Sequence, residues 1–541
     1  MKIIGLDFGT TNSTISYYNT ESKALDGFRY SASTNDYIPT VVSYNLKNEN
    51  DISIGDDAKD NLTSKNFEVY ENFKLRLGKN FDEVIENKTK TPIIVTRDFI
   101  KNLLEMYKSS QRIDNIEGIV MTVPETWFRE ASNRTARENI EGIFNELGYN
   151  ETEFLLESEP VAAAAYFCRS YEQKKSNPSG KKYNGFITVI DYGGGTLDVT
   201  LCEAVNGEEI KVLERCGFGE YNKTNGCAGV AFDEAVVEKL IRDNKLSIPK
   251  DSPKFLKLRN RFEKKKITTC DKITEGLKYY YDDPGIMEGK ALFSLEYSED
   301  GDTIDVYCED LDECFNKINA PKLKESLEQI KQFFDAHKID SSAQENFKVL
   351  LVGGFSNFCS VEKEVRAFFN SKIEYIDNRF EQLSIQNRAL AISRGAALIA
   401  EKEIIPIHTC THSFGYIVVT SGEGDNWVDK YIPVIEKGTD IKELIKPKFA
   451  NDTVRVRHKA GKLRIFIDDG RPDYAGRLQT ALDESVSDLF PNIDDNNLEK
   501  EYYIGFSINK NQIPTIHIKD VNGSSKPTSL NKLLERIAIT Q

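Results

Sequence analysis

The strongest constraint on the fold is a pattern that occurs twice in the chain. Residues 3–18 read IIGLDFGTTNSTISYY and residues 186–202 read FITVIDYGGGTLDVTLC. Each copy has an apolar run, an Asp followed by an aromatic residue, a turn rich in Gly and Thr, and a second run of alternating polarity. This pattern predicts strand, tight turn, strand. Two copies predict two related lobes, each of which offers one hairpin turn to a shared cleft.

A third glycine turn follows another buried-strand pattern, FKVLLVGGFSN, and the residues after it have helical spacing. Amphipathic spacing predicts helices at Arg129–Leu147, Ala231–Asn244, Leu256–Tyr280, Pro321–His337 and Asn387–Ala400. After residues 401–406 the chain changes to short strands and turns, which predict a small antiparallel sandwich. These strands are expected at Phe414–Thr420, Thr453–His458, Lys462–Asp468, Tyr502–Asn509 and Thr515–Lys519, with a short helix at Leu530–Ile537.

Composition excludes several classes of protein. The chain has 541 residues, 71 Lys and Arg against 86 Asp and Glu, and a formal net charge of −15. This charge opposes a protein built to coat nucleic acid or anionic membranes. No apolar run approaches the roughly 18 residues of a spanning helix, and the start of the chain lacks a signal-peptide pattern. The nine cysteines form no CxxC pair, so we expect reduced thiols in a soluble, cytoplasmic protein.

The residues of the turns are suited to phosphate. Glycine lets the backbone approach closely, so that consecutive N–H groups can point at phosphate oxygens, and threonine hydroxyls add donors. Asp7 and Asp191 precede the two turns, and a carboxylate is favourable beside phosphate when a hydrated Mg²⁺ lies between them. A single such turn could be purely structural. Three in order, without a Walker A or GxGxxG motif, predict a nucleotide held between paired hairpins.

These motifs resemble those of a known superfamily. DFGTTNS, DYGGGTLDVT and VLLVGGFSN are similar to the two phosphate motifs and the adenosine motif of actin-like ATPases. Residues 122–167, TVPETWFREASNRTARENIEGIFNELGYNETEFLLESEPVAAAAYF, resemble the heat-shock protein 70 family, and the likeness continues more weakly to Lys526. It implies an α/β fold, a two-lobed actin-like ATPase with a ribonuclease H-like duplication, followed by a β-sandwich. The implied parts are residues 1–184, residues 185–400 (with 387–400 returning to the core) and residues 401–541.

The resemblance also implies roles for particular residues. The first phosphate turn would comprise Asp7, Gly9, Thr10, Thr11 and Asn12, and the second Gly193, Gly194, Gly195 and Thr196. Catalytic roles would fall to Lys59, which would reach the γ-phosphate and the attacking water, and to Glu159, Asp191, Thr196 and Asp198. Asp7 and Asp191 would hold Mg²⁺ through water. Contacts to ATP or ADP would also come from Gly229, Glu263, Lys266, Gly353, Gly354 and Phe355.

The chain departs from the family pattern around adenine. The base-stacking arginine after the glycine turn is missing, because the turn reads GGFSN. Phe355 could contact the nucleoside or belong to the core. The flanking helix allows two registers, one with Glu263 and Lys266 and the other with Asp271, Thr274 and Lys278.

The C-terminal region resembles the family's peptide-binding domain, but the linker before that domain and the helical lid after it are not recognised. The family's linker is not recognisable in residues 400–416, and its helical lid of roughly a hundred residues is not expected, because only about fifteen residues follow Lys526. Basic residues gather at Lys446, Lys448, Arg455, Arg457, Lys459, Lys462 and Arg464. They could form a solvated sheet face or dock an acidic partner. His408 and His412 flank Cys410 without a nearby fourth ligand, so no metal is assigned there.

The leading hypothesis is a slow, Mg²⁺-dependent ATPase of the chaperone type. Its nucleotide state would alter the grip of the C-terminal domain on an extended or unfolded peptide or a dedicated protein, with J-domain or nucleotide-exchange helpers. The alternative is a nucleotide-sensing scaffold with one dedicated partner and little turnover. A small-molecule kinase and an actin-like filament are further possibilities. Neither nucleic acid nor a membrane is an expected partner.

Overall fold

The computed structural model divides the chain into two compact units. The first unit comprises Met1–Thr126 and Ile143–Pro406, and the second comprises Trp127–Gly142 and Ile407–Gln541. The predicted boundaries at 184/185 and 400/401 remain a prediction. The structure describes residues 2–29, 37–78, 81–85, 88–129, 134–150, 152–174, 176–218, 226–250, 252–298, 300–339, 347–372, 380–381, 385–410, 413–421, 427–455, 462–468, 478–485, 501–511, 513–521 and 526–528.

The first sheet contains the first predicted hairpin. β1 (Ile3–Phe8) pairs antiparallel with β2 (Asn12–Asn19) and parallel with β8 (Gly118–Val123). The sheet has the order β3-β2-β1-β8-β9, with β4 also paired to β2. The remaining strands are β3 (Ala24–Gly27), β4 (Ile38–Pro39) and β9 (Phe154–Ser158).

The second sheet repeats this arrangement. β10 (Gly185–Tyr192) pairs antiparallel with β11 (Leu197–Val205) and parallel with β15 (Phe347–Val352). The order is β16-β15-β10-β11-β12-β17, so five strands reproduce the order of the first sheet and β17 is added at the edge. The other strands are β12 (Glu209–Phe218), β16 (Phe380–Glu381) and β17 (Ile405–Ile407). The predicted α/β duplication is therefore confirmed.

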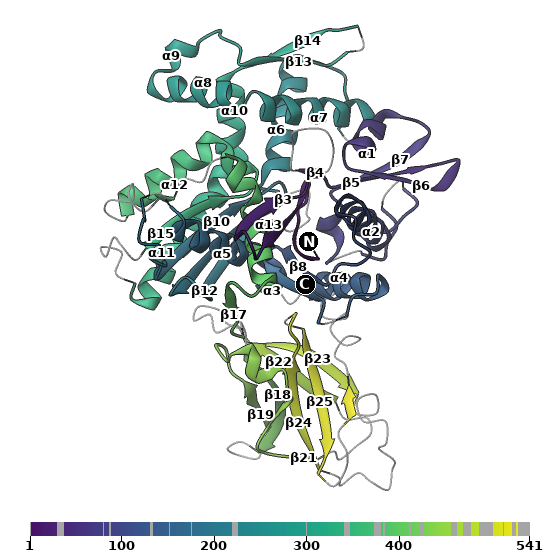
Figure 1. Cartoon of the computed structure of the whole chain (residues 1–541), viewed down its shortest axis with the longest axis vertical. Helices are drawn as coiled ribbons and strands as arrows, with labels where there is room; N and C mark the ends of the chain where they lie inside the picture. Colours follow the sequence, from purple (N-terminus) through teal and green to yellow (C-terminus); the bar gives the residue numbers. More distant parts are fainter. Residues whose placement is uncertain are drawn as a thin grey trace. The chain divides into compact units, whose positions relative to one another are not determined.

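Two helices form the core between these sheets, α5 (Glu159–Glu172) and α13 (Ile385–Ala400) (Figure 1). One buried cluster joins Val161–Cys168 of α5 and six α13 residues to side chains of both sheets. The backbones approach so closely that a methyl group added at Gly395 would lie 1.7 Å from the Ala162 carbonyl oxygen. Ser16 and Ser393 share a buried hydrogen bond of 2.8 Å between their hydroxyls, which fixes α13 against the first sheet.

Further elements surround this core. The first unit also contains β5 (Val41–Asn45), β6 (Asn48–Ile54), β7 (Phe67–Glu71), β13 (Phe293–Glu296), β14 (Thr303–Val306), α1 (Asp56–Asp60), α2 (Pro92–Gln111), α6 (Gly229–Asp243), α9 (Pro284–Met287), α10 (Cys308–Cys314), α11 (Ala320–His337) and α12 (Cys359–Lys372). No helix in the described part of the chain is long and apolar enough to cross a bilayer.

The helix predicted at Leu256–Tyr280 is two helices, α7 (Pro253–Thr268) and α8 (Cys270–Asp282). The hydroxyls of Thr268 and Thr269 donate to the carbonyls of Lys264 and Lys265. Such local bonds compete with helix propagation. The prediction of one continuous helix was therefore wrong at Thr269.

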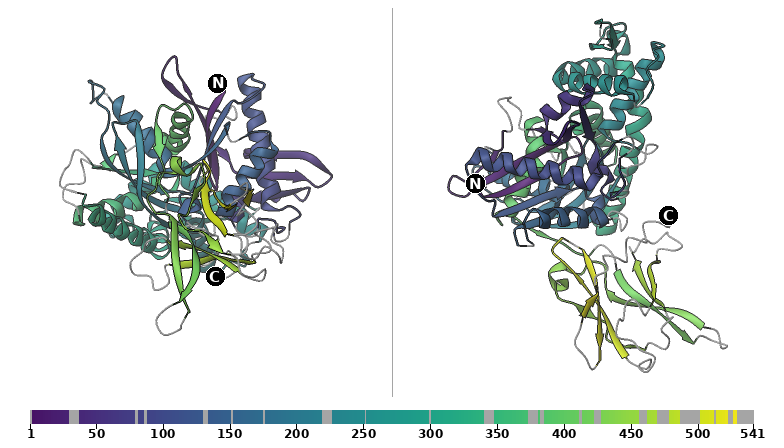
Figure 2. Two further views of the ribbon diagram at one scale, coloured as in Figure 1. Left: turned by 90° about the horizontal axis from the view of Figure 1, so that it is seen from below. Right: turned by 90° about the vertical axis from the view of Figure 1, so that its right-hand side faces the viewer.

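The second unit contains the predicted sandwich, with two sheets seen as separate layers in the right-hand view of Figure 2. Their orders are β19-β18-β22-β23 and β20-β24-β25-β26, with β21 paired to β24. Buried residues of both sheets share one core. The strands are β18 (Ser413–Ser421), β19 (Trp427–Ile435), β20 (Lys448–Phe449), β21 (Val454–Arg455), β22 (Lys462–Asp468), β23 (Leu478–Ser485), β24 (Glu501–Ile508), β25 (Pro514–Asp520) and β26 (Lys526–Thr528). The predicted helix at Leu530–Ile537 lies outside the described residues.

The helix segment of the second unit, from α3 (Thr126–Arg129) and α4 (Arg134–Glu146), contacts the turn between β24 and β25. Arg137 Nη1 donates to the Asn511 carbonyl at 2.8 Å, and Glu141 accepts from the Asn511 amide at 3.1 Å.

The contact between α5 and α13 gives a test of packing. We expect Gly395→Ala to lower the free energy of unfolding by about 3 kcal/mol or more, because its methyl group would overlap the Ala162 carbonyl. The matched control is Gly142→Ala in α4, where nothing lies within 4 Å of the new methyl group. That change should be neutral or stabilise by up to about 1 kcal/mol. Denaturant unfolding measures both, and equal effects would contradict the packing described.

Candidate functional site

The two glycine turns meet in the first unit. A methyl group at Gly194 would lie 2.7 Å from Thr11 Cγ2, and one at Gly195 would lie 2.5 Å from Thr10 Oγ1. Any side chain at these two glycines would therefore fill the space between the turns. The second turn is closed by a 3.0 Å bond from the Gly193 N–H to the Thr196 carbonyl. The structure thus brings together the two turns predicted from the repeat.

The start of α6 completes the second turn. The N–H groups of Gly229 and Val230 donate to the carbonyls of Gly193 and Gly194, at 3.1 and 2.8 Å. A methyl group at Gly229 would lie 3.4 Å from the Gly193 oxygen and from Phe355. Gly229, predicted as a nucleotide contact, therefore lies beside the phosphate turn.

Four carboxylates around the turns and the start of α5 are buried: Asp7, Glu159, Asp191 and Asp198. Asp191 and Asp198 face each other across β10 and β11. Burial, followed by the nearby charge of Glu159, raises the pKa of Asp7 to about 7. Burial and the neighbouring carboxylates, Glu159 first, raise the pKa of Asp191 well above its usual range. The site therefore carries an excess of buried negative charge.

One lysine enters this cluster. Lys74 lies in a short 3-10 turn, Phe73–Arg76, that follows Asn72 in the left-handed conformation (φ 56°). Its side chain is 2% exposed, and Nζ donates to Glu159 Oε1 at 2.8 Å and to the Phe8 carbonyl. Lys74 also lowers the pKa of Asp7 and Asp191, against the larger effect of burial.

Lys59, predicted to reach the phosphate, is engaged elsewhere. It lies in α1 and donates to Glu263 Oε2 of α7 at 2.8 Å. Burial alone would lower its pKa, but Glu263 and then Glu71 outweigh burial and raise it. The charged groups that act on Lys59 are those of α7 and β7, whereas those that act with Lys74 are the buried acids. The cation that contacts the acid cluster in the structure is Lys74, which the sequence analysis missed, and the catalytic role of Lys59 stays a prediction.

Helix α7 carries the register that contains Glu263 and Lys266. Lys266 Nζ lies 2.5 Å from Asp233 Oδ1 of α6 and over the rings of Phe232 and Phe355. Asp271, Thr274 and Lys278 belong to the separate helix α8. Of the two registers considered, the first lies next to the Phe355 turn.

The third glycine turn lies against the acid cluster. Gly353 has φ 84°, and a methyl group there would lie 2.3 Å from Asp191 Oδ1. A methyl group at Gly354 would meet no described atom within 4 Å, so this side of the turn is open. Phe355 is buried and stacks on Phe358 with an interplanar angle of 7°. Of the two interpretations of Phe355, the structure favours a core residue.

Comparison with known proteins identifies the family of the chain. The family model described as "Hsp70 protein" matches residues 3–106 and 86–401. The chain belongs to the Hsp70 family. The match ends before the strands of the sandwich, so the Hsp70 assignment rests on residues 3–401.

Three curated relatives are each named "Chaperone protein DnaK". The protein of Mycoplasma mobile is 26% identical over 391 residues, 71% of this chain and 57% of the relative. Those of Thermosipho africanus and Thermotoga neapolitana are 24% identical over 379 and 410 residues, 68% and 73% of this chain and 55% and 60% of the relative. Each alignment thus spans little more than half of the relative's length.

The buried acids predict an unusual pH dependence of stability. Because the folded state raises the pKa of Asp7 from 3.8 to about 7, its contribution is fully present below pH 4 and is lost as the pH rises through 7. Asp7→Asn should therefore stabilise the protein without nucleotide or Mg²⁺ at pH 8, by up to about 4 kcal/mol. The gain should shrink at pH 5. Thermal unfolding at both pH values, with exposed Asp271→Asn as control, measures it, and equal gains at both would contradict the assignment.

Proposed function

We propose that this Hsp70-family protein binds ATP and ADP between the two glycine turns and hydrolyses ATP slowly with Mg²⁺. The observation that carries the proposal is the convergence of both turns on a buried cluster of four acids and one lysine. Backbone N–H groups and a lysine can accept phosphate charge, while carboxylates require a cation.

The residues present fit Mg²⁺. Asp191 Oδ2 is buried and has no hydrogen-bond partner among the described residues. Within the same part of the chain, no three His, Cys, Asp or Glu side chains are arranged to ligate a metal ion directly. This agrees with a hydrated Mg²⁺ that Asp7 and Asp191 would hold through water. When bound, Mg²⁺ would supply positive charge between these carboxylates and the phosphate oxygens.

The chain's own groups would act by position and charge. Phosphoryl transfer to water depends on alignment and charge compensation more than on a strong base. Lys74, held by Glu159 and the Phe8 carbonyl, would face the γ-phosphate and the attacking water. Asp198 and Thr196 would orient the water and the phosphate. The N–H groups of both turns would bind the phosphate oxygens, and Gly354 would leave room for the nucleoside.

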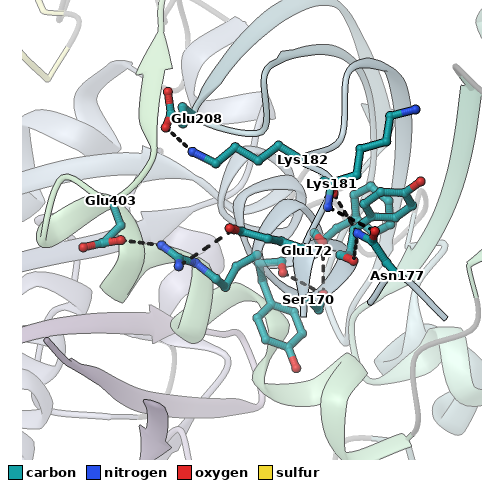
Figure 3. A network of polar contacts seen from close by, with 11 residues as sticks. Ser170, Glu172, Asn177, Lys181, Lys182, Glu208 and Glu403 are labelled. Atoms are coloured by element: carbon teal, nitrogen blue, oxygen red, sulfur yellow. Dashed lines mark hydrogen bonds and ion pairs between the residues drawn. The ribbon is translucent and has the colours of Figure 1, made fainter. Parts of the chain in front are cut away.

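The segment that leaves the first unit offers a route by which bound nucleotide would affect the sandwich. β17 pairs with the edge strand β12, and the Ile405 N–H donates to the Glu208 carbonyl at 2.7 Å. Arg169 of α5 bonds Glu403 just before β17, and Lys182 bonds Glu208 (Figure 3). The start of the outgoing chain is therefore tied to the ATPase core by backbone and charge.

We further propose that the sandwich binds an extended or unfolded peptide or a dedicated protein, with J-domain or nucleotide-exchange proteins as helpers. The basic stretch gives little support to an acidic partner. Arg455 is bonded to Glu501 and Arg464 to both oxygens of Asp429, so these arginines are already neutralised. Arg457 and Lys459 lie outside the described residues.

A second candidate is a nucleotide-sensing scaffold with little turnover. It is favoured by Phe355, which fills core beside the turn where the family pattern leads to a stacking arginine. Binding to many unrelated peptides would support the chaperone, and one specific partner would support the scaffold. Phosphate release without an acceptor would count against a kinase.

Variants of Lys74 and Lys59 test which of the two lysines acts in ATP hydrolysis. We expect Lys74→Ala to reduce phosphate release from Mg²⁺·ATP at least about 100-fold, because it removes the cation closest to the developing charge. Lys59→Ala should keep turnover within a few-fold, because its partner is Glu263. Single-turnover phosphate release measures both. A Lys59→Ala protein that is as inactive as Lys74→Ala would restore the original assignment.

Tryptophan fluorescence tests the coupling. The chain has two tryptophans, Trp127 and Trp427, and both belong to the second unit. In a Trp127→Phe background, Mg²⁺·ATP bound in the first unit should change the emission of Trp427, which is 71% exposed. Arg169→Met should reduce this change without altering nucleotide affinity, because it removes the bond to Glu403. An unchanged signal in Arg169→Met would exclude this route.

A further inference from the structure

A second buried charge pair lies at the start of α5, outside the acid cluster. Glu125 follows β8, and its Oε1 lies 2.8 Å from Nε of Arg215 on β12. The side chains are 1% and 7% exposed. Ser158, the last residue of β9, donates its hydroxyl to Glu125 Oε2. Elements of both sheets thus meet in one buried trio.

Ser158 stands at a position where a serine usually caps the following helix. It is the N-cap residue of α5, where a serine side chain ordinarily accepts a bond from the helix backbone. Here it makes no capping bond, and its hydroxyl goes to Glu125 instead. The helix therefore forgoes a local bond worth about 1 kcal/mol for one that fixes the direction of its first turn.

Stability alone does not explain the pair. A buried ion pair often contributes no more than apolar residues of the same size, because both charges lose water. Arg215 Nη1 is buried and finds no hydrogen-bond acceptor among the described residues, and neither does Thr200 Oγ1, opposite it on β11. Such unsatisfied groups lower stability further. An ion pair that lowers stability in this way points to a role in positioning neighbouring groups.

The residue after Ser158 is Glu159, the carboxylate that bonds Lys74. We propose that Glu125 and Arg215, acting through Ser158, are positioning residues that hold Glu159 against Lys74. This inference rests on the proposed ATPase function. The trio acts on the backbone at the start of α5, so that a change at Arg215 on β12 reaches the lysine at the acid cluster without a direct contact.

Through the Glu125–Arg215 pair, the position of Glu159 also depends on how the two sheets lie against each other. Ser158 ends β9 of the first sheet and Glu125 follows β8 of the same sheet, whereas Arg215 belongs to β12 of the second. Glu159 is therefore aligned only while β12 stays beside the end of β8. Positioning of this kind affects turnover more than nucleotide binding, because a displacement of about 1 Å can reduce a rate about 100-fold.

The test compares four variants with wild type. Arg215→Met keeps the aliphatic stem but removes the positive charge beside Glu125 Oε1, and Glu125→Gln with Arg215→Met removes both charges. Ser158→Ala removes the hydroxyl, and Ser158→Thr retains it. The control is Lys239→Met, which breaks partly buried ion pairs of Lys239 with Asp310 and Glu313, between α6 and α10. Single-turnover phosphate release gives the rate, and calorimetry with Mg²⁺·ADP gives the affinity.

We expect Arg215→Met and Ser158→Ala to lower the rate at least about 10-fold while the dissociation constant for Mg²⁺·ADP stays within about 3-fold. Ser158→Thr and the double variant should recover part of the rate, and Lys239→Met should leave it unchanged. Wild-type rates in Ser158→Ala and in the double variant would overturn the inference, as would equal losses in rate and affinity. A wild-type protein that binds Mg²⁺·ATP but releases no phosphate would overturn the proposed function itself.

Discussion

The structure depends on a buried imbalance of charge. Asp7, Glu159, Asp191 and Asp198 are all almost excluded from water, and Lys74 brings a positive charge into their group through its bond to Glu159. Desolvation raises the pKa of Asp7 and of Asp191, so these two carboxylates are harder to ionise than in water. A fold that holds these acids together has a free-energy cost that a bound cation would lower. Both glycine turns and both sheets serve to keep that arrangement in place.

Charge pairs connect the halves of the first unit in two places, and their burial differs. At one level, Lys59 bonds Glu263 and Arg259 bonds Glu71, with the Lys59 side chain 30% exposed. At the next, Glu125 and Arg215 are almost fully buried. Exposed pairs are weak and screened by salt, whereas breaking a buried pair is costly. The Lys59–Glu263 pair is therefore the easier one to open, and the Glu125–Arg215 pair is the firmer one.

Local patterns in the sequence were sufficient for the main features of the fold. The hairpins β1–β2 and β10–β11 follow from alternating polarity around glycine, and both turns were identified from their own residues. Their approach through Thr11 and Gly194 could be inferred because the pattern occurs twice. β19 was not predicted, because Pro433 interrupts it and most of its side chains are exposed. Pro433 is tolerated beside the irregular register at Phe414 and Gly415.

The misses within the site share a cause: they depend on contacts between distant segments. Lys74 lies in a short turn without periodicity, and only the fold brings it to Glu159, 85 residues away. A lysine flanked by Phe73 and Leu75 was the available signal. Lys59 matched a family position, yet its partner lies 204 residues further along the chain. Ser158 likewise looks like an ordinary helix cap until Glu125 is placed beside it.

The close contact of α13 with α5 and with β1 bears on how the protein can move. The second sheet is formed between residues 185 and 381 and by β17, yet α13 returns to pack on the first sheet through Ser393 and on α5 through Gly395. The half built on β10–β12 is thus attached by two chain crossings, one before Gly185 and one before Ile385. Two connections restrict the relative motion of the two halves to rotation about the axis that joins them. Nucleotide-driven motion would then have a single axis, set by covalent connectivity before any ligand binds.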